Sequence, residues 1–176
     1  GPSRAPATVG SIAAPPGHIR EIAVDGPLAY VAGWPGWLWI VDVSVPRLPL
    51  EVGRIATPLL DLTSVGVSGG VAVAAGQRLR PGQDWGQPTA SGPGRIVAFD
   101  VADPAHPRVA ASLDVAGTPL DLALAEDLAC IASGSAGLRL LRVEVALPGP
   151  RPTARPSASP APHRTTAWLP VASARS

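Results

Sequence analysis

Short apolar runs of four to seven residues recur along the chain, and Gly, Pro or polar residues separate them. Runs of this length that are rich in Val, Ile, Leu and Ala are typical of buried β-strands. Nowhere does the sequence hold a long segment with the 3.6-residue apolar period of a bundle helix. The pattern therefore predicts an all-β protein.

The apolar runs fall into four groups that recur in the same order, as an internal repeat. Reading one repeat from its first strand to its fourth, the groups are 19–24, 62–67 and 120–125; 28–33, 71–76 and 128–133; 38–46, 96–104 and 138–146; and 9–15, 52–58 and 109–115.

The repeat length identifies the architecture. Leu28 and Val71 are 43 residues apart, and Val71 and Leu128 are 57 apart, or 42 once an insertion of 15 residues in the second repeat is removed. Four short strands in about 42 residues is typical of a β-propeller blade. Because closed propellers have about four to eight blades, three repeats predict a partial propeller, or a ring completed by missing blades or by self-association.

Domain boundaries follow from the repeats and from a change in composition. Beyond residue 147 the chain is rich in Pro, Ala and Ser and has no apolar periodicity, which predicts a disordered linker and tail. The expected division is a partial propeller over 1–147, with 9–15 as the last strand of a preceding blade, blades at about 16–58, 59–119 and 120–147, and a tail over 148–176.

Three segments carry a family resemblance. Residues 28–46 (LAYVAGWPGWLWIVDVSVP), 94–110 (GRIVAFDVADPAHPRVA) and 135–145 (SAGLRLLRVEV) are similar to the LVIVD repeat, with Arg142 where that repeat has Asp. The resemblance covers about residues 9–147. It implies a β-propeller of the bacterial and archaeal cell-surface or secreted proteins that carry this repeat, and so an extracellular or cell-surface location.

Composition excludes several classes of protein. A formal net charge of +1 argues against a nucleic-acid binder that works by charge, and a single cysteine excludes a disulfide scaffold. Gly33, Pro35 and Gly36 interrupt the longest apolar stretch, so no membrane span is expected. We expect Cys130 to be a small buried hydrophobic residue.

The polar residues give no catalytic or metal-binding pattern. Asp42 and Asp100 each precede a proline by four residues, where we expect them to accept hydrogen bonds from turn amides. The spacing of His18, His106 and His163 is not that of metal ligands. We therefore predict no catalytic residue, no metal and no cofactor.

Two features are candidates for ligand binding. Trp34, Trp37 and Trp39 either fill space between blades or form an aromatic patch for a glycan or partner. The insertion in the second repeat is either an incidental surface loop or a recognition loop, in which Trp would stack and Arg would bind carboxylate or phosphate. The candidate residues of that loop are Arg78, Arg80, Gln83, Asp84, Trp85 and Gln87.

These observations favour a non-enzymatic scaffold on the cell surface or outside the cell, which binds a protein, glycan or other ligand through its blade loops. Two alternatives stay open. The chain could be part of a propeller enzyme whose polar residues come from other blades, or it could be a structural spacer in the cell envelope.

Overall fold

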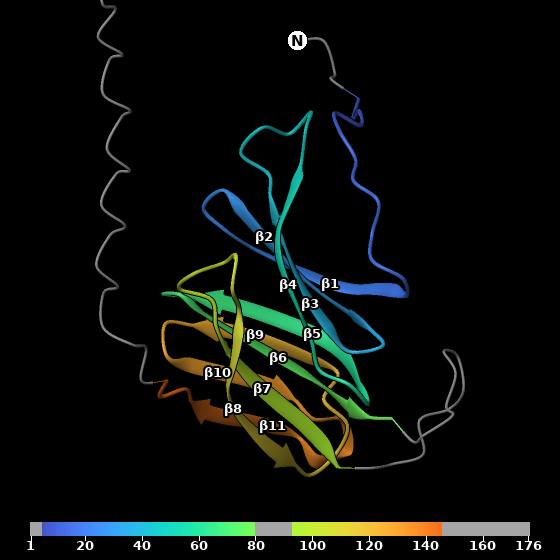
Figure 1. Cartoon of the computed structure of the whole chain (residues 1–176). Helices are drawn as coiled ribbons and strands as arrows, with labels where there is room; N and C mark the ends of the chain where they lie inside the picture. Colours follow the sequence, from blue (N-terminus) through green and yellow to red (C-terminus); the bar gives the residue numbers. More distant parts are fainter. Residues whose placement is uncertain (1–4, 80–92, 146–176) are drawn as a thin grey trace, which may run out of the picture.

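A computed structural model of the chain describes residues 5–79 and 93–145. Within these residues the protein consists of eleven β-strands and one short 3₁₀ helix, Gly134–Ala136 (Figure 1). No helix in this part of the chain has the length and apolar character needed to cross a membrane. The strands are β1 (His18–Asp25), β2 (Leu28–Trp34), β3 (Trp37–Asp42), β4 (Leu50–Ala56), β5 (Leu60–Ser68), β6 (Val71–Arg78), β7 (Gly94–Asp100), β8 (Arg108–Val115), β9 (Asp121–Ala125), β10 (Leu128–Ala132) and β11 (Leu138–Arg142).

The strands form three antiparallel sheets in chain order. The first sheet is β1-β2-β3-β4, the second is β5-β6-β7-β8, and the third is β9-β10-β11. The prediction of an all-β chain with three repeated sheets is confirmed, although the third sheet has three strands in the described residues instead of the four expected. The predicted tail over 148–176 lies outside those residues.

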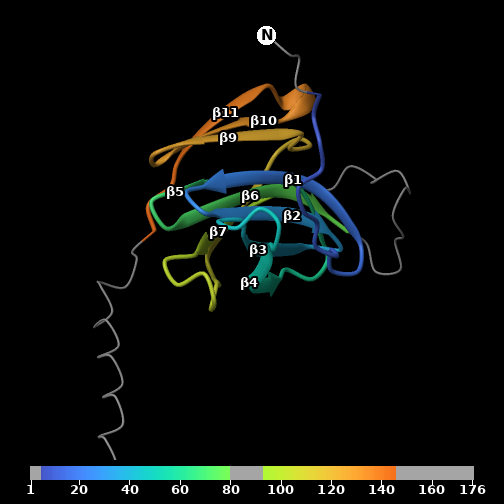
Figure 2. The ribbon, with the colours of Figure 1, turned by 90° about the horizontal axis from the view of Figure 1, so that it is seen from above.

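The three sheets stack one after another in the manner of consecutive blades. Strand β5 packs against β1 and β2 of the preceding sheet, and β9 packs against β5 and β6 in the same way. Figure 2 shows the third sheet as a layer on the second. The second sheet thus turns one face to the first sheet and the other to the third. The first strands of the three sheets, β1, β5 and β9, correspond to the innermost strands of propeller blades.

The hydrophobic core lies between the sheets, because each sheet is apolar on both faces. The first interface buries side chains from both of its sheets, among them Tyr30, Leu38, Ile40, Leu62, Val97 and Phe99. The second interface is smaller and comprises Val73, Ala75, Ile96, Val115, Leu122, Ala129 and Ile131. Alanines at these positions on β6 and β10 let the sheets approach closely.

Bulges in the innermost strands supply polar links between blades. The ladder of β1 skips Arg20, and the ladder of β5 skips Thr63 at the corresponding position. Both side chains reach forward to the next blade: Arg20 binds Asp61, and Thr63 Oγ1 donates to the Pro119 carbonyl at 3.1 Å. A bulge redirects a side chain in this way because its residue has no partner in the ladder.

The turn role expected of two aspartates is confirmed. Asp42 Oδ1 accepts a hydrogen bond from the Ser44 amide at 2.8 Å, and Asp100 Oδ1 accepts one from the Ala102 amide at 3.1 Å. Hydrogen bonds from Ser44 lower the pKa of Asp42. Each carboxylate thereby fixes the turn between the third and fourth strands of its blade.

Two sequence-based expectations are corrected. Residues 9–15 form no strand, since no neighbouring strand in the described chain pairs with them. Their assignment to a preceding blade stays a prediction. Cys130 is only partly buried, because the face of β10 that carries it has no sheet packed on it in the described residues.

Candidate functional site

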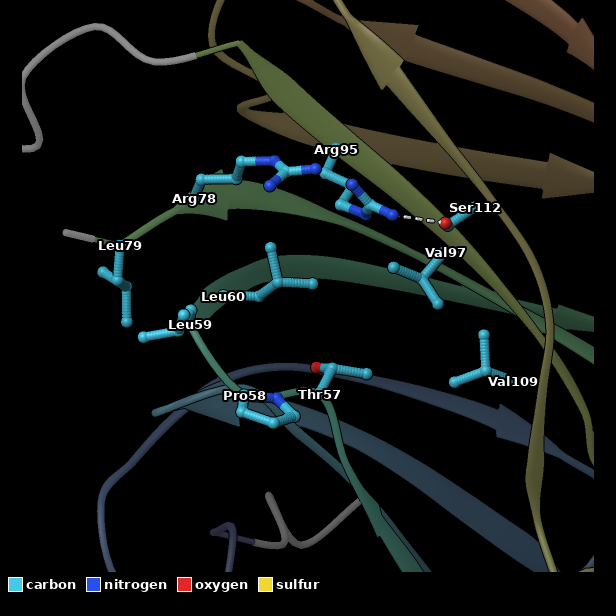
Figure 3. Close-up of a pocket in the computed structure, with 10 residues that line it drawn as sticks. All are labelled: Thr57, Pro58, Leu59, Leu60, Arg78, Leu79, Arg95, Val97, Val109 and Ser112. Carbon is cyan, nitrogen blue, oxygen red and sulfur yellow. Dashed lines mark hydrogen bonds between the residues drawn. The ribbon is translucent and has the colours of Figure 1, made fainter. Parts of the chain in front are cut away.

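A pocket of about 350 Å³ lies where the first blade meets the second, at the end of β6 that leads into residues 80–92 (Figure 3). The connection between β4 and β5 forms one wall, and β6, β7 and β8 form the other. Its lining is mostly apolar with two arginines at the rim: Thr57, Pro58, Leu59, Leu60, Arg78, Leu79, Arg95, Val97, Val109 and Ser112.

The sheet register brings the polar lining residues together. Arg95 lies opposite Asp114 in the β7–β8 ladder, and Val97 lies opposite Ser112 two positions further along the same face. Arg78 ends β6 and pairs with Leu60 of β5. Residues far apart in the sequence therefore meet at one edge of the second blade.

The two arginines of the pocket share one carboxylate. Arg95 Nη1 donates to Asp114 Oδ1 at 2.9 Å, and Arg78 Nη2 donates to both oxygens of Asp114 at 3.2 and 3.3 Å. Arg95 also donates to Ser112 Oγ at 2.6 Å. Two guanidinium groups against one carboxylate leave one positive charge in excess, so this rim attracts anions.

The floor of the pocket contains a buried hydroxyl and an unusual backbone conformation. Thr57 Oγ1 is buried and has no hydrogen-bond partner among the described residues. Leu59 has a φ of 63°, in the left-handed region that bulky side chains seldom adopt. A buried polar atom without a partner and a strained residue are both features that concentrate at ligand sites.

Only part of the predicted recognition loop can be compared with this pocket. Arg78 lies at its rim, whereas Arg80, Gln83, Asp84, Trp85 and Gln87 lie outside the described residues. The sequence analysis missed Arg95, Asp114, Ser112 and Thr57. No sequence motif marks them, because their proximity depends on the strand register and on blade packing.

The three tryptophans lie on the first blade. Trp37 and Trp39 are on the face turned away from the second blade, and Trp34 ends β2. Trp37 and Trp39 are 5% and 2% exposed and meet edge to face at 6.5 Å. Their indole nitrogens donate to the Pro16 carbonyl at 3.2 Å and to Glu51 Oε2 at 2.8 Å. Trp34 is half-buried and its ring lies 5.9 Å from that of His18. Burial at Trp37 and Trp39 leaves no open aromatic surface there, which supports the packing interpretation.

A second polar group lies along the innermost strands. Glu21, Ser64 and Asp121 occupy equivalent ladder positions, opposite Ala32, Ala75 and Ala132 in the three blades.

Burial, and then the charge of Asp121, raise the pKa of Glu21, while a hydrogen bond from the Val65 amide acts in the opposite direction. Ser64 Oγ is buried without a partner among the described residues. No cluster of three or more residues suited to metal binding occurs in this part of the chain.

Comparisons with known proteins identify the repeat. No curated protein matches the chain. Among solved structures, the chain is similar to the computationally designed protein Ika4, with 9% sequence identity, a TM-score of 0.38, and coverage of 77% of this chain and 98% of that one. The LVIVD repeat model matches residues 16–57, which span β1 to β4. The resemblance drawn from the sequence is therefore confirmed for the first blade, which is an LVIVD repeat, of the kind that forms β-propeller blades.

Proposed function

We propose that this chain is a non-enzymatic β-propeller repeat scaffold that binds a protein partner, and that the pocket between its first two blades holds an acidic side chain of that partner together with a neighbouring apolar one. The observation that carries the proposal is the pair of arginines, Arg78 and Arg95, which share a single carboxylate above an apolar floor.

The chemistry of the pocket favours such a ligand. A carboxylate could replace Asp114 at Arg78, where the present hydrogen bonds are long, at 3.2 and 3.3 Å. An apolar side chain would pack among Leu59, Val97 and Val109. The described lining contains no His, Cys, Asp or Glu, and the neighbouring carboxylate of Asp114 is bound by both arginines, which supports binding over catalysis.

The recognition loop fits the same proposal. Leu79, at the pocket wall, is followed directly in the sequence by the segment that contains Arg80 and Trp85. We propose that these residues add contacts to the same partner. An extracellular or cell-surface location remains part of the proposal, because proteins with LVIVD repeats are often found there.

The test uses three fluorescent eight-residue peptides that differ only at the residue before a central Leu, which is Glu, Gln or Lys. We expect the Glu peptide to bind more tightly than the Gln peptide by about tenfold or more, the value of a charge-assisted hydrogen bond, and the Lys peptide to bind least. Arg95→Gln should remove this preference, whereas Arg54→Gln, on the first blade and outside the pocket lining, should keep it. Equal binding of all three peptides would contradict the proposal.

A second candidate function is suggested by the polar group formed by Glu21, Ser64 and Asp121. Asp121 is close enough to Glu21 to raise its pKa, and Ser64 holds the equivalent place in the second blade. In a closed propeller these positions would face the central channel, where propeller enzymes place their active site. If the chain contributes to such an enzyme, Glu21→Gln and Asp121→Asn should abolish activity while leaving peptide binding in the blade pocket unchanged.

A further inference from the structure

The array of three blades ends in two faces that expose apolar side chains. On the third blade, the face turned away from the second carries Leu128, Leu138 and Leu140. On the first blade, the face turned away from the second exposes Ile22 and Val24 on β1, whereas Trp37 and Trp39 on β3 are buried there. No described sheet packs on either face.

Equivalent residues in the other blades are buried, so both faces have the composition of a blade interface. Leu138 and Leu140 are 71% and 59% exposed, whereas their counterparts Leu38 and Ile40 in the first blade are fully buried against the second.

On the opposite side, Ile22 is 54% exposed, and its counterpart Val65 on β5 is 3% exposed. The chain therefore carries both halves of one more interface, at opposite ends of the array.

The segment before β1 is positioned as a fourth strand would be. A Cβ on Gly53 of β4 would lie 2.2 Å from the Pro104 carbonyl oxygen of the next blade. A Cβ on Gly10 would lie 2.0 Å from the Pro46 carbonyl oxygen, and Pro46 and Pro104 hold the same place in their repeats. Residues 9–15 thus meet the first blade as β4 meets the second, although they pair with no strand.

Within the described residues, the third blade has no counterpart of β4, the strand that this segment resembles. Strand β11 ends its sheet, and its outer edge has no partner among the described residues. Residues 9–15 have the sequence pattern of β4, and two residues separate them from β1. An unpaired strand edge exposes backbone donors and acceptors that another strand can satisfy.

We propose that two copies of this chain close a six-bladed ring, head to tail. In each junction, residues 9–15 of one copy pair with β11 of the other as its fourth strand, and β1 packs on β9 and β10 as β5 packs on β1 and β2. Ile22 and Val24 thereby cover Leu128 and the neighbouring face of the third blade. The three described blades of two copies give six, which lies within the usual range of about four to eight, whereas those of three copies would exceed it.

Sedimentation of the full 176-residue chain tests the assembly. We expect a mass of twice 17.8 kDa. Leu140→Arg on one face and Val24→Arg on the other should each raise the dimer dissociation constant by about tenfold or more, whereas Leu48→Arg, exposed in a turn outside both faces, should not. A monomer at all concentrations would overturn the proposal. A dimer that neither face variant weakens would overturn it equally.

Cross-linking tests the head-to-tail junction without the arginine variants. Cys130 is the only cysteine of the chain and lies on the open face of the third blade. With Ile22→Cys, a short bismaleimide should join two chains through Cys130 and the new cysteine. Val45→Cys, in the turn after β3, should give no such product. Absence of the Ile22→Cys product, or equal yields from both variants, would exclude the head-to-tail junction.

Discussion

Arg20 and Asp61 form an ion pair that ties the innermost strands of the first and second blades together. Arg20 Nη2 donates to Asp61 Oδ2 at 2.6 Å and Arg20 Nε donates to Asp61 Oδ1 at 3.1 Å, while the Asp61 side chain is only 10% exposed. Because the pair is bidentate and half-buried, it has more effect on stability than an exposed pair.

Replacement of this arginine should weaken the first blade interface. We expect Arg20→Ala to lower the free energy of unfolding by about 2–3 kcal/mol, since it leaves the buried carboxylate of Asp61 without its charged donor. Arg142→Ala, which removes the exposed pair with Asp127, should cost less than about 1 kcal/mol. Urea denaturation measures both, and equal losses would show that Arg20 has no special role.

Leucines at equivalent positions should differ in their contribution to stability. Leu38→Ala leaves a cavity in the first blade interface and should cost about 2–5 kcal/mol. Leu138→Ala, at the open face of the third blade, should cost far less when the protein is dilute enough to be monomeric. Thermal unfolding at low protein concentration makes the comparison, and a loss at Leu138 as large as that at Leu38 would mean that its face is already covered.

A side chain at Gly53 should destabilise the protein. Its Cβ would lie 2.2 Å from the Pro104 carbonyl oxygen, so Gly53→Ala must separate the first two blades locally and should cost about 1–3 kcal/mol. Gly10→Ala creates the same clash with Pro46, yet it should cost less, because residues 9–15 are not fixed in a strand ladder. Chemical denaturation measures the free energy of unfolding of both variants. An unchanged free energy of unfolding in Gly53→Ala would contradict this explanation.

The stability of the protein should carry a pH-dependent contribution from Glu21. Burial and Asp121 raise its pKa above the ordinary value of 4.5, so the folded state holds this proton more firmly than the unfolded state does. Ionisation of Glu21 therefore lowers the free energy of unfolding as pH rises from 4.5 through the pKa of the folded state. Below pH 4.5 this loss of stability is absent. The free energy of unfolding of wild type and of Glu21→Gln is measured against pH. As pH rises across this window, the variant should become more stable relative to wild type. A constant difference would contradict the assignment.

Much of the fold could be predicted from the sequence, because each strand is a short apolar run at a fixed place in a repeat. Strands β2, β6 and β10 lie almost exactly where the runs beginning at Leu28, Val71 and Leu128 place them. Residues 9–15 show the limit of this reasoning. Their pattern is that of a strand, but a strand forms only beside a partner, and the pattern contains no information about whether that partner is present.

The pocket could be predicted only in part. Arg78 can be predicted from the sequence because it lies near the start of a conspicuous insertion, but the pairing of Arg95 with Asp114 depends on a bulge that sets the register of β7 and β8. The sequence left two interpretations of the tryptophans open, packing or an aromatic patch. The burial of Trp37 and Trp39 on the first blade supports packing for these two.

The most direct test of the proposed function is the affinity of the Glu-Leu peptide for wild type and for Asp114→Asn, measured by fluorescence polarisation at one salt concentration. Asp114 occupies the arginines that the ligand's carboxylate needs, so its neutralisation should tighten binding by about tenfold, without the same gain for the Gln-Leu peptide. Unchanged or weaker binding of the Glu-Leu peptide to Asp114→Asn would contradict the account.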